Sequence, residues 1–130
     1  MQTKLMIIGS AFGFIAVVNG AFGSHALREI IPDDRLDVWE TASRYMMYHA
    51  IAILLSAVMM DKFHVNQVQL AGWSFVIGVI LFCGSLAIVA LTGITWFGAL
   101  APFGGSAFLF GWAFLAAGAW KASKVISAQR

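Results

Sequence analysis

Charged side chains are scarce in this sequence. Only 11% of its 130 residues are Asp, Glu, Lys or Arg, whereas a typical soluble domain has about 25%. A charge near the centre of a lipid bilayer costs about 3 kcal/mol, so this scarcity is typical of a chain that lies in a membrane. The basic residues flank apolar runs and form no patch. The net charge of +2 therefore indicates membrane topology and gives no reason to expect nucleic-acid binding.

Cysteine and proline are also rare, with one and two residues respectively. Cys83 alone forms neither an internal disulfide nor a cysteine metal cluster, and we interpret it as a small core residue. Pro32 ends any helix before it. Pro102, followed by Phe103-Gly104-Gly105, is expected to break or delay the first turn of the last helix. The sequence has no Ser/His/Asp set, phosphate loop or metal motif, so we expect no enzyme, no metal site and no cofactor.

Apolar residues, in contrast, make up 61% of the chain and gather in four runs, at residues 5–27, 45–60, 70–93 and 97–120. A bilayer core about 30 Å thick needs about 20 apolar residues per helix. The sequence therefore predicts an all-α fold and a single transmembrane domain, 1–130. This domain is an integral membrane four-helix antiparallel bundle, with helices at about 4–27, 34–60, 69–93 and 102–122. The first run is longer than the apolar core of a signal peptide, so we expect it to remain as a helix.

The charges on the connections predict an orientation. One side carries Lys4, Lys62, Lys121, Lys124 and Arg130, and the other carries Arg28, Arg35 and Arg44 together with Glu29, Asp33, Asp34, Asp37 and Glu40. Cytoplasmic loops are enriched in Lys and Arg. We therefore expect a multi-pass protein of the cell inner membrane with its N- and C-termini in the cytoplasm. Asp33 or Asp34 is expected to cap the second helix.

Four of the five tryptophans fit the same arrangement. Trp39 and Trp96 fall at one predicted interface, and Trp73 and Trp120 fall at the other. An aromatic belt predicts this placement, because an indole ring is apolar with one polar N–H. Trp112 is the exception, because it lies within the fourth run.

Small residues form stripes on the first and last helices. Gly9, Gly13, Ala16, Gly20 and Gly23 alternate at spacings of four and three residues, and Gly104, Gly111 and Gly118 recur every seven. Lipid supplies no hydrophobic drive for helices to associate, so close backbone approach matters. We predict that these stripes are helix–helix seams, and that one of them is free for a partner chain if the bundle uses the other. A pore or hinge is the alternative.

Polar side chains gather toward the outer end of the predicted bundle. The candidates for ligand binding are His25, Arg44, Tyr45, Tyr48, His49 and Asn19. Three interpretations remain open: interface anchors, a structural cluster that joins helices, or a ligand site. In a ligand site, His25 and His49 at matching depth would hold a haem or a metal. A cation beside tyrosines would instead hold an anionic headgroup or a quinone.

Asn19 is the deepest strongly polar side chain of the predicted bundle. We expect it to form an interhelical hydrogen bond worth about 0.6 kcal/mol, with a polar path through the bundle as the alternative. No acidic residue lies inside a predicted span, since Asp61 stands at a boundary. This argues against a pump that depends on an intramembrane carboxylate.

Four groups of residues, in order along the chain, resemble the motifs of a known family. They are Asn19–Leu27, Trp39–Ala42 with Tyr48–Ala50, Leu81–Leu86 with Leu91–Gly93, and Ala101–Gly105. By these motifs the chain resembles the uncharacterised small four-span inner-membrane proteins that include the YgdD-like proteins and a small animal transmembrane protein. The resemblance implies a four-span bundle without an assigned activity. Ser24 and Phe103 replace commoner Ala and Ile, and Met46-Met47 stand where more polar residues are expected.

These observations predict an integral membrane protein rather than an enzyme. The expected role is that of a structural or accessory four-helix bundle that self-associates or supports a membrane complex. Its expected partners are the lipid bilayer and either a second copy or another membrane protein. An alternative is a small-molecule or lipid-binding protein, or a minor transporter, that uses the outer polar cluster. A second alternative is a bis-histidine haem protein built on His25 and His49.

Overall fold

The computed structural model describes residues 1–128, which form four long helical segments. They are α1 (Gln2–His25), α2 (Asp33–Phe63), α3 with α4 (Asn66–Gly78 and Gly84–Thr92), and α5 (Ala101–Ala128). A π-helical turn, Val79–Cys83, joins α3 to α4 in one continuous rod, and 3₁₀ turns at Leu27–Glu29 and Thr95–Leu100 lie in the other connections. The predicted all-α fold with four long helices is confirmed.

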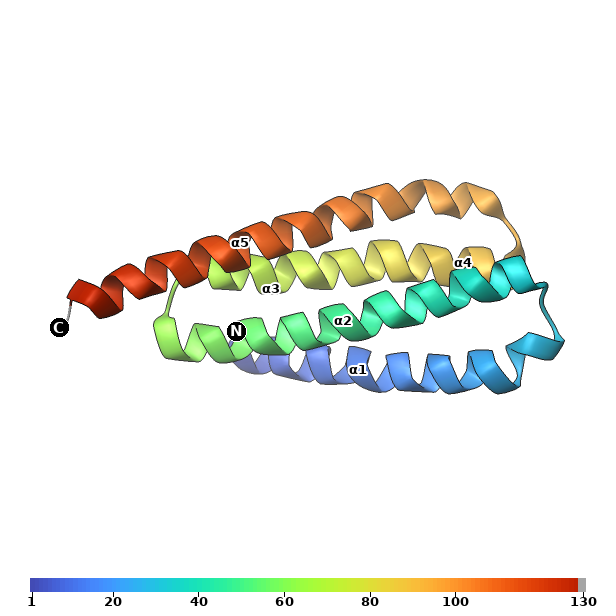
Figure 1. Cartoon of the computed structure of the whole chain (residues 1–130), viewed down its shortest axis with the longest axis horizontal. Helices are drawn as coiled ribbons and strands as arrows, with labels where there is room; N and C mark the ends of the chain where they lie inside the picture. The colour runs from blue at the N-terminus through green and yellow to red at the C-terminus, as the bar shows by residue number, and fades with distance from the viewer. Residues whose placement is uncertain (129–130) are drawn as a thin grey trace.

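The four segments run antiparallel and lie side by side in the order α1, α2, α3–α4, α5 (Figure 1). α1 packs along α2 and α5 packs along α3, so that α2 and α3–α4 form the centre. In the most apolar stretch of each central segment, 39% of the residues are buried. The corresponding share is 17% in the segment that contains α1 and 22% in the segment that contains α5. The two outer helices therefore present most of their surface to the surroundings.

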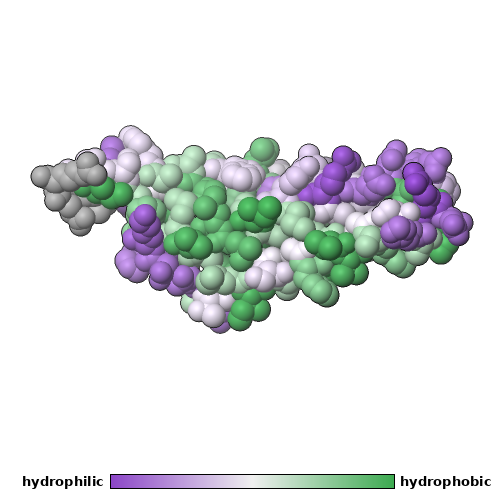
Figure 2. Space-filling model, turned by 60° about the horizontal axis from the view of Figure 1, so that its bottom comes forward, coloured by the Kyte–Doolittle hydropathy of each residue, from purple (hydrophilic) through white to green (hydrophobic). Residues whose placement is uncertain are grey.

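All four segments are long and apolar enough to cross a membrane, judged by length and composition. The spans are Gln2–Glu29, Asp33–Phe63, Asn66–Thr92 and Thr95–Lys124. Figure 2 shows one face of the molecule, where hydrophobic side chains cover much of the middle and hydrophilic ones gather toward both ends. A bilayer requires this pattern, because its core offers no water to polar groups.

The charged residues divide between the two ends as the sequence predicted. Lys4, Lys62, Lys121 and Lys124 lie toward the end where α2 meets α3, and the acidic first connection lies at the other end (Figure 1). Arg130, which was counted with the lysines, lies outside the described residues 1–128. The chain therefore has one basic end and one mixed, mostly acidic end.

The connection between α2 and α3 is shorter than predicted. α2 continues to Phe63 and α3 begins at Asn66, so only His64 and Val65 separate them. His64 adopts the left-handed conformation, with φ 48°, and ends α2 as a glycine or asparagine commonly does. This geometry allows two residues, His64 and the buried Val65, to reverse the chain where the sequence predicted a longer turn.

Two predictions about helix starts are wrong. α2 begins after an extended Pro32 that forms no side-chain cap, and Asp33 and Asp34 instead lie in its first turn, where the helix dipole favours negative charge. Pro102 neither breaks nor delays the last helix, because α5 begins one residue earlier, at Ala101, and continues. In the first turn a missing N–H has no helical partner to lose.

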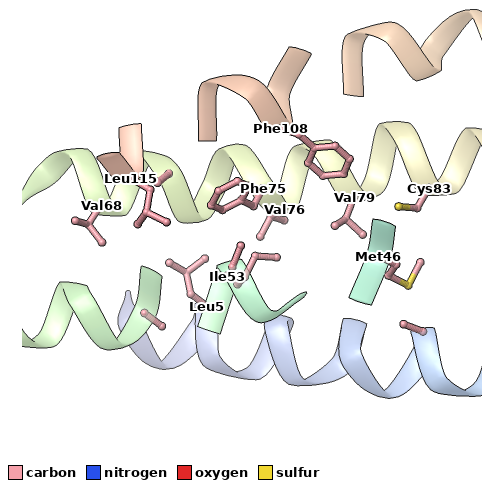
Figure 3. Close-up of a cluster of buried hydrophobic side chains, with 14 of the residues drawn as sticks. Leu5, Met46, Ile53, Val68, Phe75, Val76, Val79, Cys83, Phe108 and Leu115 are labelled. Carbon is pink, nitrogen blue, oxygen red and sulfur yellow. The ribbon is translucent and has the colours of Figure 1, made fainter. Parts of the chain in front are cut away.

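The main core lies where the central helices meet their outer neighbours (Figure 3). Its fully buried side chains include Leu5 of α1, Ile53 of α2, and Val68 and Phe75 of α3. A second, smaller cluster packs the first connection onto the end of the bundle opposite the α2–α3 connection, and consists of Leu27, Ile31, Leu36, Trp39 and Ala90. The first turns of α2 are therefore part of the packed bundle.

The glycine stripe of α1 faces α2 only in part. A Cβ at Gly9 would lie 3.0 Å from Leu54 and 3.2 Å from the Ala50 carbonyl, and one at Gly23 would lie 2.8 Å from the Trp39 ring. Gly13 is looser, because its nearest atom would be 3.9 Å away. Gly20 meets nothing within 4 Å, since its side of α1 faces away from α2. Gly20 is therefore no seam residue within this chain.

The glycine stripe of α5 packs inside the bundle along its whole length. A Cβ at Gly104 would contact the backbone of Phe82, one at Gly111 would lie 2.5 Å from the Phe75 ring, and one at Gly118 would lie 2.6 Å from Val68. These contacts hold α5 against α3 and the π-helical turn. The stripe is thus occupied within the chain, and it is not free for a partner.

Candidate functional site

An open groove of about 510 Å³ lies between α2 and α5, beside the π-helical turn. It is lined by Tyr45 and His49 from α2, Phe82 from the π-helical turn, and Pro102, Gly105, Ser106, Phe108, Leu109 and Trp112 from α5. His49 lies near the midpoint of the 31-residue α2, and Trp112 lies near the midpoint of α5. The groove therefore runs from Pro102, in the first turn of α5, to the middle of the helical segments, where His49 and Trp112 lie. His49 is thus deeper along the bundle than the sequence predicted.

Both ring nitrogens of His49 have a hydrogen-bond partner. Nδ1 lies 2.8 Å from the Tyr45 carbonyl oxygen. Because a carbonyl only accepts, Nδ1 carries the hydrogen and donates it. Nε2 is then the acceptor, and the indole N–H of Trp112 donates to it over 3.3 Å. These two bonds fix the neutral tautomer of a side chain that is only 5% exposed.

Aromatic rings surround this histidine on several sides. Phe108 stacks on the imidazole with ring centroids 3.5 Å apart and an interplanar angle of 7°. Phe75 lies 5.6 Å from the imidazole on the core side, and Tyr45 lies 4.9 Å from Phe82 at the outer end of the groove. Trp112 meets Phe75 edge-on at 5.1 Å. A polar pair is thus placed within an aromatic wall.

Local sequence explains why these rings converge. Tyr45 and His49 are four residues apart on α2 and share one face, as predicted. Phe108 and Trp112 have the same spacing on α5. Gly104 lets α5 approach the backbone of Phe82, and the π-helical turn that contains Phe82 is a feature often found at functional sites. The groove is therefore formed by two matched helix faces and one irregular turn.

The chemistry available in the groove is hydrogen bonding and aromatic contact. The Trp112 indole is a donor and His49 Nε2 is an acceptor. Among residues 1–128, no three His, Cys, Asp or Glu side chains come together as a metal site. Cys83 is a free, fully buried thiol that packs in the main core, in line with its interpretation as a core residue.

The structure separates the remaining predicted site residues from this groove. His25 is exposed at the end of α1, beyond the level where Gly23 meets Trp39. From Trp39 to His49 the helix rises about 15 Å. His25 and His49 therefore lie at different depths and do not form a bis-histidine pair. Arg44 and Tyr48 are exposed on α2 and do not line the groove.

Asn19 contributes an interhelical hydrogen bond through its backbone and not through its side chain. Its carbonyl oxygen accepts from the indole N–H of Trp39 over 2.8 Å. Trp39 is only 6% exposed and packs edge-on against Phe22 at 6.0 Å. The interpretation of Trp39 as a belt residue is therefore wrong, because Gly23 leaves room for its ring between α1 and α2. Trp96 and Trp120 remain exposed, at 71% and 65%.

Of the residues that line the groove, the ligand-binding candidates predicted from the sequence included only Tyr45 and His49. The aromatic residues that were missed are Phe82, Phe108 and Trp112. The sequence did contain one signal, because Trp112 was the tryptophan that did not fit an interfacial belt. An indole N–H in mid-membrane needs a protein partner, and His49 is the buried side chain on α2 that supplies an acceptor. The phenylalanines gave no signal, since such residues are ordinary in a membrane helix.

Comparison with known proteins identifies relatives of this sequence. Residues 19–105 match the model of a family described as "Protein of unknown function (DUF423)". The UPF0382 membrane protein YwdK of Bacillus subtilis (strain 168) is 41% identical over 117 residues, which cover 89% of this chain and 95% of that protein. The UPF0382 membrane protein SAB0533 of Staphylococcus aureus (strain bovine RF122 / ET3-1) is 43% identical over 110 residues, or 85% and 89% of the two chains. No solved structure matches the chain.

Proposed function

Because the chain belongs to the DUF423 family of membrane proteins, we propose that it is a non-enzymatic accessory protein that acts by associating with a second copy of itself in the membrane. The observation that carries this proposal is Gly20, whose missing side chain faces open space. A glycine inside a helix costs about 1 kcal/mol relative to alanine. At Gly9 and Gly23 close packing offsets that cost, whereas at Gly20 nothing within this chain does so.

The exposed side of α1 has the composition of a helix–helix contact. Ser10, Val17, Gly20 and Ser24 recur at spacings of seven, three and four residues, and all four are exposed. Small residues let two helices approach closely in lipid. α1 also packs mainly on one neighbour, α2, which leaves this side free. The same side of a second copy is the partner we propose, in a symmetric contact.

The proposal that the protein is not an enzyme rests on its buried polar groups. Within residues 1–128, the buried polar side chains are Ser43, His49, Ser56 and Ser85. Each serine hydroxyl donates to a carbonyl three or four residues earlier in its own helix. Both nitrogens of His49 are also engaged. Among the buried side-chain atoms of residues 1–128, Oε1 of Gln67, in the first turn of α3, is the one without a hydrogen-bond partner. The buried polar groups are thus almost all satisfied, which supports a binding or structural role.

The self-association is tested by cysteine cross-linking in membranes, in a Cys83→Ala background. Val17→Cys on the exposed side of α1 should form a disulfide-linked dimer, and Ile80→Cys on the central segment should not. Adding Gly20→Leu should abolish the Val17→Cys dimer. Gly84→Leu is the matched control, because a Cβ at Gly84 also meets nothing within 4 Å. Undiminished cross-linking in the Gly20→Leu variant would contradict the proposal.

We also propose that the protein lies in the cell inner membrane with both termini in the cytoplasm. The support is the placement of the lysines at one end of the bundle, opposite the acidic first connection, together with the bias of cytoplasmic loops toward Lys and Arg. In the Cys83→Ala background, Asp34→Cys should react with an impermeant maleimide on intact cells. Lys62→Cys should react only after the membrane is opened. The reverse pattern would invert the topology.

The family relationship extends, we propose, to the YgdD-like proteins and to the small animal transmembrane protein. The support is the order of the motifs around His25, Trp39, Tyr48–Ala50 and Pro102 along the whole chain. An alignment of those proteins should place a tryptophan at position 39 opposite a small residue at position 23, because that pair packs α1 on α2. A bulky residue at position 23 beside a retained tryptophan would argue against the relationship.

A further inference from the structure

We propose that the groove between α2 and α5 binds a lipid-soluble phenol, whose hydroxyl group inserts between the indole N–H of Trp112 and Nε2 of His49. This site lies on the opposite side of α2 from α1. It is therefore independent of the self-association proposed through Gly20, and either proposal survives the failure of the other.

The ligand would replace the hydrogen bond between Trp112 and His49. Trp112 Nε1 and His49 Nε2 are 3.3 Å apart, which is long for a hydrogen bond. Both residues line the groove. Trp112 is 47% exposed, so its ring has free space beside it. A ligand at this position competes with a long bond between a half-exposed indole and a buried imidazole.

The polar group of the ligand follows from the hydrogen-bonding roles of His49 and Trp112. Nδ1 of His49 donates to the Tyr45 carbonyl, so Nε2 remains an acceptor, and the indole of Trp112 is only a donor. A hydroxyl accepts from Trp112 and donates to His49 at the same time. A ketone, ester or ether oxygen only accepts, and would leave the buried Nε2 without a partner, which is costly. The pair therefore selects a hydroxyl.

The apolar part of the ligand follows from the aromatic rings that line the groove. Tyr45, Phe82 and Phe108 form an aromatic wall, with ring centroids 4.9 Å to 6.4 Å apart. Aromatic pairs prefer stacked or edge-on contacts at such distances, and gain energy beyond the burial of area. A ligand with an aromatic ring beside its hydroxyl forms such contacts with the wall. An acyl chain gains only the free energy of burying its apolar surface. The groove is open and is lined by residues of helices long and apolar enough to cross a membrane, so the ligand enters from the lipid phase.

The test uses the full-length protein in lipid nanodiscs and three probes. Para-nonylphenol has the ring and the hydroxyl, para-nonylanisole has the ring with a methyl ether, and decanol has a hydroxyl without a ring. Binding is followed by the indole N–H signals of the five tryptophans in two-dimensional NMR spectra. The Trp112 signal is identified by its loss in Trp112→Phe. Trp96→Phe is the control, because Trp96 is exposed and does not line the groove.

Para-nonylphenol should shift the Trp112 signal saturably and bind at least about tenfold more tightly than para-nonylanisole, the ratio for one well-formed hydrogen bond to a buried group. Decanol should bind more weakly than para-nonylphenol. In His49→Phe, which keeps a ring but lacks the acceptor, the phenol and its ether should bind equally. If that variant does not fold, the comparison of the three probes on the unaltered protein decides alone.

Three results would overturn the proposal. Equal affinity for the phenol and its ether would mean that the groove is an apolar surface, occupied by acyl chains. If decanol bound as tightly as para-nonylphenol, the aromatic wall would have no part in recognising the ligand. If the position of the Trp112 signal changed with protein concentration but with none of the three probes, a second copy of the chain would occupy the groove.

Discussion

The indole N–H of Trp112 donates to Nε2 of His49 across the groove between α5 and α2. The two helices are joined mainly through α3 and the π-helical turn, and this bond adds to the stacking of Phe108 on His49 as a direct link between them. It also gives a polar partner to the one histidine that is buried among residues 1–128. Stability and ligand binding therefore depend on the same pair of atoms.

Replacing Trp112 with phenylalanine should destabilise the protein by about 1–3 kcal/mol. The change keeps an aromatic ring but leaves the buried Nε2 of His49 without a donor, and such an orphaned group carries its full desolvation cost. The measurement is the free energy of unfolding in detergent micelles. Trp120→Phe is the matched control, because Trp120 is 65% exposed, and it should change stability little.

A double-mutant cycle separates this bond from the loss of packing. His49→Leu removes the acceptor, so adding Trp112→Phe to it should cost less than Trp112→Phe alone. The coupling energy should lie near the 0.6–1.7 kcal/mol measured for hydrogen bonds between membrane helices, or about 1 kcal/mol. Strict additivity of the two changes would mean that the contact contributes nothing to stability.

Gly104 and Gly105 should respond very differently to alanine, although they are neighbours. A Cβ at Gly104 would collide with the backbone of Phe82, whereas one at Gly105 meets nothing within 4 Å. Gly104→Ala should therefore destabilise the protein by about 1–3 kcal/mol, as overpacking does. Gly105→Ala should be neutral or stabilising, because alanine is the better helix former. Unfolding of the two variants in parallel tests this, and equal stabilities would show that α5 does not approach the π-helical turn.

Replacing Gly93 should destabilise the protein because of the backbone conformation of this residue. It ends α4 with φ 73°, a conformation that costs an L-residue with a Cβ about 1–2 kcal/mol. The Arg35 guanidinium also lies 2.8 Å from the position of a Cβ there. Gly93→Ala should lower the free energy of unfolding by at least about 1 kcal/mol, and Gly93→Asn by less. Gly84→Ala, in a right-handed helix with open space around it, is the control, and a loss as large as that of Gly93→Ala would refute the backbone explanation.

The four helices followed from the sequence because their cause is local. Each apolar run has the length that a bilayer requires, and Gly93 and Pro32 stand at ends of helices where their backbone preferences place them. The connection at His64 was missed because an αL conformation in a residue other than glycine is rare. Local chemistry thus gave the helices but not each boundary.

The candidate site followed from the sequence only in part, because it depends on how the helices align. Spacing alone placed Tyr45 and His49 on one face. The depth of His49, and its distance from His25, depend on the level at which α1 and α2 pack, which the contact of Gly23 with Trp39 sets. The partner of His49 lies 63 residues away on α5, where no periodicity points to it. The level at which two helices pack along each other depends on how their side chains fit together. This level cannot be predicted from the spacing of residues in one sequence.

Trp39→Phe should cost less than Trp112→Phe, although both changes remove one indole hydrogen bond. Trp39 donates to the Asn19 carbonyl, which also accepts a backbone hydrogen bond inside α1 and so keeps a partner when the indole is lost. The expected loss is the net value of one hydrogen bond, about 0.5–1.5 kcal/mol, and Phe at position 39 retains the contact with Gly23. The effect should be local, so amide hydrogen exchange should rise at Ser24 and His25 while α3 and α5 stay protected. A loss as large as that of Trp112→Phe, or faster exchange throughout the bundle, would show that the outer end of α1 is held by this bond and not by the cluster around Leu27 and Leu36.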